Sequence, residues 1–111
     1  MDQQAPSDPA AVDALRARPG TLWIFKHSRI CPESAAARAE VEEYGRAHAD
    51  DFIGITVVQD HRAASDHAAK VFGVPHESPQ ILLLRDGRVA WHASHGEVTQ
   101  AAMEMQRLPG L

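Results

Sequence analysis

The chain has 111 residues and a formal net charge of −4, a length that fits one domain around one hydrophobic core. The acidic balance argues against a general nucleic-acid binder, which carries a surplus of Lys and Arg. No stretch approaches the roughly 18 apolar residues of a membrane span, and the opening MDQQAPSDPA lacks the basic start and apolar run of a signal peptide. We therefore expect a cytosolic protein with a disordered polar tail over residues 1–6 and a single domain over residues 7–111.

Hydrophobic patterning and capping signals predict four helices and four strands. Asp8 before Pro9 is typical of a helix start, Asp60 can cap a later helix, and Gly73 can end it. In chain order, the predicted elements are helix 9–18, strand 21–27, helix 32–48, strand 53–58, helix 61–72, strand 80–85, strand 88–92 and helix 99–108.

The order of these elements predicts the topology. Strand 21–27 is apolar over its middle without alternation, which indicates a central strand covered on both faces. Asp86-Gly87 between the last two strands is a hairpin signal, so these strands are antiparallel neighbours. A βαβ unit followed by a ββα unit gives an α/β fold, a four-stranded mixed sheet with helices on both faces.

Helix 32–48 is expected to bury one apolar face and to expose its charged residues. Pro32 suits the first helical position, which makes Cys31 the N-cap residue. The residues spaced for the apolar face are Ala35, Ala36, Ala39, Val41 and Tyr44.

Cys31 is the only cysteine, so the chain cannot form an internal disulfide. A lone cysteine is either a small buried hydrophobe or a reactive group, and a helix N-terminus favours the reactive thiolate. Lys26, His27 and Arg29 add positive charge before it, whereas Glu33 opposes their effect. The context predicts that Cys31 is a nucleophile for thiol–disulfide exchange.

The motif Cys31-Pro32-Glu33-Ser34 has the spacing of a CxxC redox motif with serine in place of the second cysteine. A mixed disulfide formed at Cys31 must then be resolved by an outside thiol. Pro79 stands just before a predicted strand, where proline is tolerated, and sequence alone leaves the isomer of the preceding peptide bond open.

Three stretches together resemble the monothiol bacilliredoxins, thioredoxin-like proteins of bacillithiol-producing bacteria. They are TLWIFKHSRICPESAAA (21–37), VFGVPHESPQILLL (71–84) and GRVAWHASHGEVT (87–99). The resemblance implies a thioredoxin-like fold and an enzyme that removes bacillithiol from protein mixed disulfides, with Cys31 matching the nucleophile and Pro79 a cis-proline that faces it. The chain departs from the resemblance at Ile30 and Glu33, where we expect a threonine and an apolar residue.

The resemblance also implies the partners, which are S-bacillithiolated client proteins and bacillithiol itself as co-substrate, with no bound cofactor. Bacillithiol carries carboxylates that basic side chains can hold by charge-assisted hydrogen bonds. The expected substrate-binding residues are Lys26, His27, Arg29, Ser34, His76, Ser78 and Pro79. Nothing in the sequence indicates an obligate oligomer, so we expect a monomer, without nucleic-acid or membrane partners.

Two other functions fit the same sequence. One is a non-catalytic adaptor that uses the thioredoxin-like sheet to hold partners, and the other is a glutaredoxin-like enzyme that uses a different low-molecular-weight thiol. The seven histidines form no zinc motif, so we expect no metal site. Among them, His27 and His95 are expected at strand ends, with backbone hydrogen bonds or supporting roles.

Overall fold

A computed structural model describes residues 8–107, and the expected tail and the end of the last predicted helix lie outside that range. The elements are α1 (Pro9–Ala17), β1 (Thr21–His27), α2 (Pro32–Ala47), β2 (Phe52–Val57), α3 (Arg62–Phe72), β3 (Gln80–Arg85), β4 (Arg88–Ser94), the short 3₁₀ helix η1 (His95–Glu97) and α4 (Gln100–Arg107).

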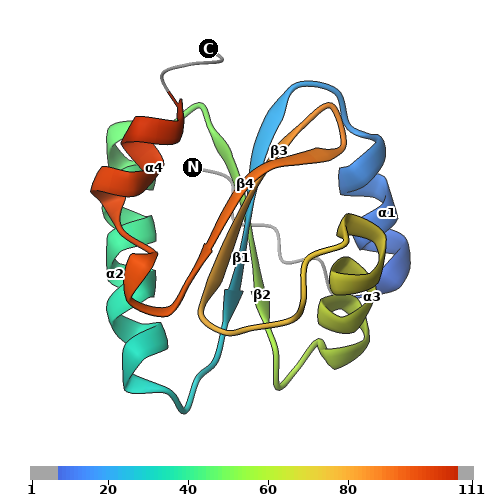
Figure 1. Cartoon of the computed structure of the whole chain (residues 1–111), viewed down its shortest axis with the longest axis horizontal. Helices are drawn as coiled ribbons and strands as arrows, with labels where there is room; N and C mark the ends of the chain where they lie inside the picture. Colours follow the sequence, from blue (N-terminus) through green and yellow to red (C-terminus); the bar gives the residue numbers. More distant parts are fainter. Residues whose placement is uncertain (1–7, 108–111) are drawn as a thin grey trace.

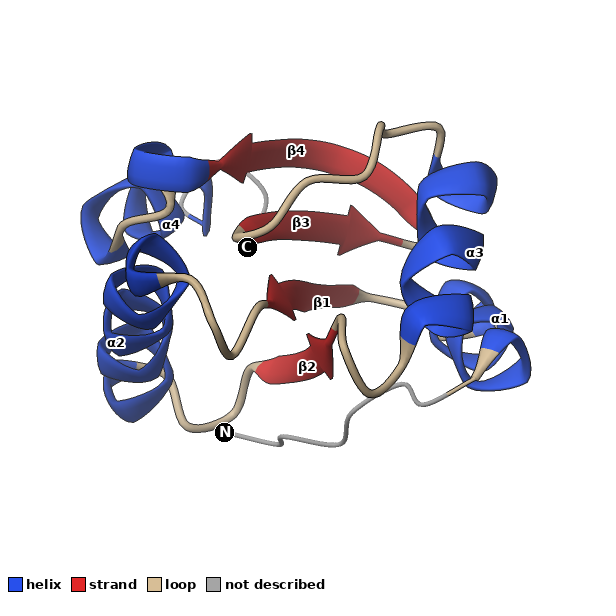
Figure 2. Ribbon diagram, turned by 90° about the horizontal axis from the view of Figure 1, so that it is seen from below, coloured by secondary structure: helices blue, strands red, loops and turns tan. Residues whose placement is uncertain are grey.

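The four strands form one mixed sheet in the order β2-β1-β3-β4. β1 pairs in parallel with β2 and antiparallel with β3, and β3 pairs antiparallel with β4. Helices α2 and α4 cover one face and α1 and α3 the other (Figures 1 and 2). The predicted α/β architecture is therefore confirmed, because the parallel pair is joined through a crossover helix and the last two strands through a hairpin.

The side chains of β1 alternate between two hydrophobic clusters on opposite faces of the sheet. Trp23 and Phe25 lie in the cluster that contains residues of α2, whereas Leu22 and Ile24 lie in the other. From Leu22 to His27 the whole strand is buried, as predicted for a strand covered on both faces.

Two local predictions about the helices are wrong. Ala35, Ala36 and Ala39 are exposed, and α2 instead buries a narrow stripe whose members are Ser34, Ala37, Val41, Tyr44 and Gly45. Alanine is small enough to suit either face of a helix, so its spacing discriminates poorly. Asp60 does not cap α3, since the N-cap residue is His61 and it makes no side-chain capping bond.

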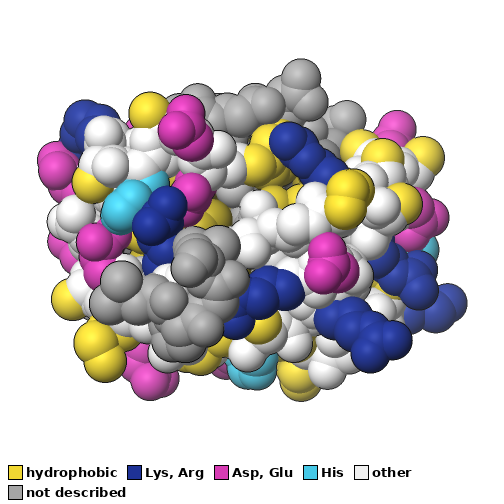
Figure 3. Space-filling view, turned by 90° about the horizontal axis from the view of Figure 1, so that it is seen from above, with side chains coloured by type: hydrophobic (Ala, Val, Ile, Leu, Met, Phe, Trp, Pro, Cys, Tyr) yellow, Lys and Arg dark blue, Asp and Glu magenta, His cyan; other side chains and the backbone are white. Residues whose placement is uncertain are grey.

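The predicted hairpin between β3 and β4 is present and also holds α1 in place. Asp86 and Gly87 have φ values of 52° and 80°, which suits a tight hairpin turn. A Cβ at Gly87 would lie 2.1 Å from the carbonyl oxygen of Arg16, so only glycine fits where α1 meets the turn. Figure 3 shows this end of the molecule, where acidic and basic side chains are interspersed.

Across residues 8–107, no helix combines the length and apolar character needed to cross a membrane.

Candidate active site

Three segments far apart in the sequence meet at the lower edge of the sheet in Figure 1. β1 ends there and leads into α2, while antiparallel β3 begins there and β4 ends there. The register places Lys26 of β1 opposite Gln80 of β3, and Gln80 opposite Ser94 of β4. The loop that carries Cys31, the loop before β3 and the η1 turn therefore share one edge.

Cys31 is the N-cap residue of α2, as predicted, and is partly exposed. Its backbone is extended, with φ −105° and ψ 117°, and its side chain makes no capping hydrogen bond. The backbone N–H groups of Ser34 and Ala35 donate to its carbonyl oxygen at 3.0 and 3.1 Å. The thiol thus stands at the N-terminal, positive end of the helix dipole.

Ser34 takes the place of a resolving cysteine and holds the loop before the helix. Its fully buried hydroxyl accepts a hydrogen bond from the Ser28 N–H at 2.9 Å and lies 3.0 Å from Nδ1 of His27. Gln59 donates to the Ser28 hydroxyl at 2.7 Å. Burial, followed by the positive charge of Arg38, lowers the pKa of His27, which favours a neutral ring that accepts from Ser34.

Lys26 and His76 come together on the opposite face of the sheet from His27. Lys26 is 1% exposed, and its Nζ lies 3.4 Å from Nδ1 of His76, which also lies 3.2 Å from the Ser65 hydroxyl. Burial lowers the pKa of Lys26 to about 8, against the attraction of Asp66. Burial and then the charge of Lys26 lower the pKa of His76.

Arg29 lies on the exposed rim of the site, toward the loop between β2 and α3. Its Nη1 lies 2.6 Å from both carboxylate oxygens of Asp60, and its backbone N–H donates to Gln59 at 3.1 Å. The guanidinium therefore has an internal partner, which a substrate carboxylate would have to replace.

The loop before β3 contains a cis peptide bond between Ser78 and Pro79. Pro79 is buried and Ser78 is partly exposed. The carbonyl oxygen of Pro79 accepts the backbone N–H of His95 at 2.9 Å, so this loop is tied to the η1 turn. The backbone hydrogen bond expected for His95 is therefore present.

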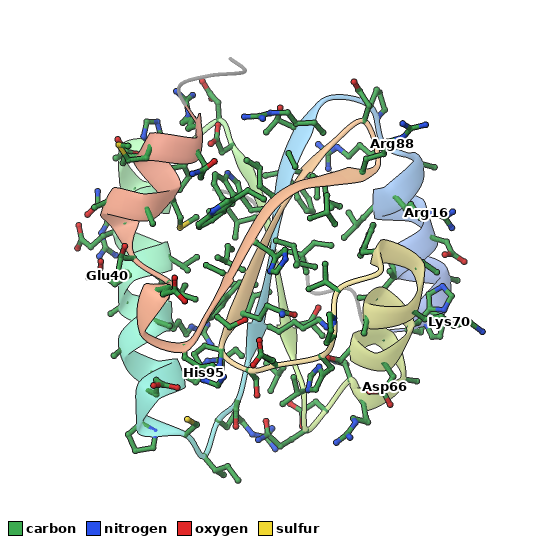
Figure 4. All side chains as sticks on the ribbon, in the orientation of Figure 1. Arg16, Glu40, Asp66, Lys70, Arg88 and His95 are labelled. Atoms are coloured by element: carbon green, nitrogen blue, oxygen red, sulfur yellow. The ribbon has the colours of Figure 1, made fainter. Side chains whose placement is uncertain are left out.

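A bridge across this edge joins His95 to two glutamates, which the sequence reasoning did not bring together. Nδ1 of His95 lies 2.6 Å from Glu33 in the first turn of α2, and Nε2 lies 3.2 Å from Glu77 in the loop before Pro79. Figure 4 labels His95 beside the end of α2 that begins at Pro32. These partners are 62 and 18 residues away in the chain, and no sequence spacing links them.

No group of three or more His, Cys, Asp or Glu side chains within residues 8–107 could hold a metal ion. What the edge does provide is one partly exposed thiol at a helix N-terminus, beside a cis-proline loop. This combination suits attack on a disulfide and pairing of an extended substrate with the proline loop.

Comparison with known families supports the same chemistry. The family described as monothiol bacilliredoxin BrxC matches residues 7–103. The chain belongs to this family. Thiol redox chemistry is the function that this membership and the fold together indicate.

Solved structures place this bacilliredoxin-family chain in the thioredoxin fold. A provisionally assigned oxidoreductase with a thioredoxin fold is 26% identical, with a TM-score of 0.86, and the match covers 94% of this chain and 92% of that one. Fasciola hepatica thioredoxin is 12% identical, with a TM-score of 0.71 and coverage of 92% and 93%. Mitochondrial thioredoxin 3 from Saccharomyces cerevisiae is 16% identical, with a TM-score of 0.73 and coverage of 93% and 91%. The two thioredoxins support the fold alone.

Proposed function

We propose that this protein removes bacillithiol from protein mixed disulfides by a monothiol mechanism in which Cys31 is the nucleophile. The observation that carries the proposal is the single thiol at the N-cap of α2, with a buried serine where a resolving thiol would stand. Family membership supports bacillithiol as the thiol that is transferred. A lone cysteine without a structural disulfide also fits a reducing compartment such as the cytosol.

The proposed reaction has two exchange steps. In the first, the Cys31 thiolate attacks the bacillithiol sulfur of the client disulfide, so that a Cys31–bacillithiol disulfide forms and the client leaves as a thiolate that takes up a proton. In the second, the thiolate of another bacillithiol attacks the bacillithiol sulfur bound to Cys31. This step restores the Cys31 thiolate and releases bacillithiol disulfide.

Ser34 supports this mechanism because it cannot resolve the intermediate. A hydroxyl has no thiolate chemistry, and this one is buried with bonds to His27 and Ser28. The mixed disulfide on Cys31 would therefore persist until an outside thiol arrives. We assign Ser34 the role of positioning the loop that carries Cys31.

Residues beside Cys31 in the chain are suited to the two parts of the mixed disulfide, the client protein and bacillithiol. Ile30 is 83% exposed next to the thiol and offers an apolar contact to a client protein. Arg29 can exchange its surface pairing with Asp60 for a bacillithiol carboxylate, because exposed ion pairs contribute little. Lys26 is buried, so we expect it to act on an anion at a distance through its charge, with the partly exposed His76 between it and the proline loop.

The deciding experiment is mass spectrometry of the protein after mixing with an S-bacillithiolated client peptide. We expect wild type to gain one bacillithiol and to release the client thiol, and Cys31→Ser to gain none. The same peptide carrying glutathione tests the identity of the thiol, since equal transfer from both would favour a glutaredoxin-like enzyme. Absence of transfer to a folded protein whose Cys31 still reacts with a small disulfide would refute the proposal and favour an adaptor.

A further inference from the structure

The bridge centred on His95 links the first turn of α2, which follows Cys31, to the loop before β3. His95 follows β4 and has φ 56°, a left-handed conformation that non-glycine residues seldom adopt. Its backbone N–H is held by the carbonyl oxygen of Pro79 at 2.9 Å. The ring is therefore fixed between the α2 first turn and the cis-proline loop, the two segments that flank Cys31.

The two partners of His95 place negative charge close to Cys31 in the chain and beside the cis-proline bond. Glu33 is two residues after Cys31, so their Cα atoms are within about 7.6 Å, and Glu77 directly precedes Ser78 of the cis Ser78–Pro79 bond. Both side chains are about half exposed, at 48%. Without a positive charge between them, these carboxylates would repel an anionic disulfide that approaches the thiolate.

The contribution of this bridge to folding is small, because an exposed ion pair is worth little. The η1 turn is already anchored by Val98, which is 2% exposed in the main hydrophobic cluster. Because the bridge adds little stability, its main effect should be electrostatic. By offsetting the negative charge of Glu33 and Glu77, it should change which charged substrates can approach Cys31.

We propose that His95 is a specificity-determining residue whose positive charge, held between Glu33 and Glu77, lets anionic disulfides reach Cys31. The inference deepens the proposed function and rests on it only in taking Cys31 as the attacking thiol. The substrate class that it favours is a disulfide bearing carboxylates, and loss of the charge shifts preference toward neutral or cationic disulfides.

The titration of the bridge gives the proposal a pH signature. The hydrogen bond that His95 donates to Glu33, followed by the one it donates to Glu77, raises the pKa of His95. Hydrogen bonds donated by Ser94 and then by His95 lower the pKa of Glu77. The charge of His92, which lies on β4, lowers it by a smaller amount. The imidazolium is therefore present at and below the ordinary histidine range and is lost as pH rises through the raised pKa.

The test compares the rates at which Cys31 reacts with two small disulfides, the dianionic 5,5′-dithiobis(2-nitrobenzoate) and the neutral bis(2-hydroxyethyl) disulfide. Both need the same thiolate, so the ratio of the two rate constants largely cancels changes in thiolate fraction. We expect His95→Gln to lower the ratio of anionic to neutral rate by about three- to tenfold at low salt, and by less at about 1 M salt.

Matched variants separate charge from structure. Glu33→Gln and Glu77→Gln should each raise the ratio, and adding both to His95→Gln should restore it. His67→Gln is the control, because His67 pairs with Asp13 at 2.8 Å between α3 and α1 and should leave the ratio at the wild-type value. As pH rises through the His95 titration, the wild-type ratio should fall by more than the His95→Gln ratio, in which only other groups such as Lys26, with a pKa of about 8, still titrate.

Equal slowing with both probes would show that His95 only positions the loops, and an unchanged ratio in all the variants would show that the bridge does not influence substrate charge. Either result overturns the inference. Neither depends on bacillithiol transfer, so the proposed function can fail while this ratio still responds, and the reverse can also occur.

Discussion

The two ends of α2 are joined to the rest of the protein by similar chemistry in different surroundings. At the C-terminal end, Asp51 accepts hydrogen bonds from the Tyr44 hydroxyl, from Trp23 Nε1 at 3.4 Å and from Arg107 Nε at 3.3 Å. At the N-terminal end, His95 is bonded to Glu33. The Asp51 side chain is 15% exposed, whereas that of His95 is 49% exposed.

Because of this difference in exposure, the Asp51 network contributes mainly to stability, whereas we expect the His95 bridge to act mainly on function. Around Asp51, burial works against ionisation, but the hydrogen bonds from Tyr44, Arg107 and Trp23 together hold the pKa of this carboxyl below its ordinary value. Burial and the bond to Asp51 raise the pKa of Tyr44. This network keeps its charge state near neutral pH, whereas the exposed bridge at the other end can change its charge in that range.

The largest expected effect is a loss of stability on removing the partly buried Asp51 carboxylate. Asp51→Ala leaves Tyr44, Trp23 and Arg107 without their acceptor, and we expect the free energy of unfolding to fall by about 2–4 kcal/mol. Urea denaturation followed by circular dichroism measures it. Asp50→Ala, at the exposed neighbouring position, should change it by less than about 0.5 kcal/mol. Similar losses in both variants would contradict the role given to the network.

A smaller loss of stability is expected when Ser34, which holds the loop before α2 through Ser28 and His27, is replaced. Ser34→Ala removes the acceptor of the buried Ser28 N–H and should cost about 1–3 kcal/mol of unfolding free energy, measured by the same denaturation. The loop that carries the thiol should also loosen, so the rate of Cys31 with the neutral disulfide should change. Ser65→Ala is the control, a fully buried serine on the other face of the sheet; it should leave that rate unaltered.

The smallest expected effect is on the pH dependence of stability, and it has opposite signs at the two ends. Because the pKa of His95 is raised, its stabilisation is complete below about 6.5 and is lost as pH rises through the folded pKa. Because the pKa of Asp51 is lowered, its stabilisation is complete above about 3.8 and is lost as pH falls through the folded pKa.

Urea unfolding at several pH values checks this. The difference between wild type and His95→Gln should shrink from pH 6 to pH 9, while that for Asp51→Ala should stay constant over this range and shrink only in acid. A constant difference for His95→Gln across the neutral range would show that the bridge does not depend on the imidazolium.

Much of the fold could be predicted because its signals are local. The apolar run at 21–27, the Asp86-Gly87 turn and the Gly73 cap, at φ 70°, each act within a few residues. The 3₁₀ turn η1 was not predicted, since a single short turn has no periodic pattern. The role of Asp60 was also misread, because a residue that can cap a helix can equally pair with Arg29 across a loop.

The sequence by itself determined that there is one thiol, that it begins a helix after a buried strand, and that no second thiol can resolve it, because these follow from residue identity and from spacing over a few positions. Only the tertiary structure decided that Ser78–Pro79 is cis, that the Lys26 side chain contacts His76, and that His95 joins Glu33 to Glu77. The physical reason is that such contacts depend on how separate loops are brought to one sheet edge by the strand register, and side chains that meet there share no pattern along the chain.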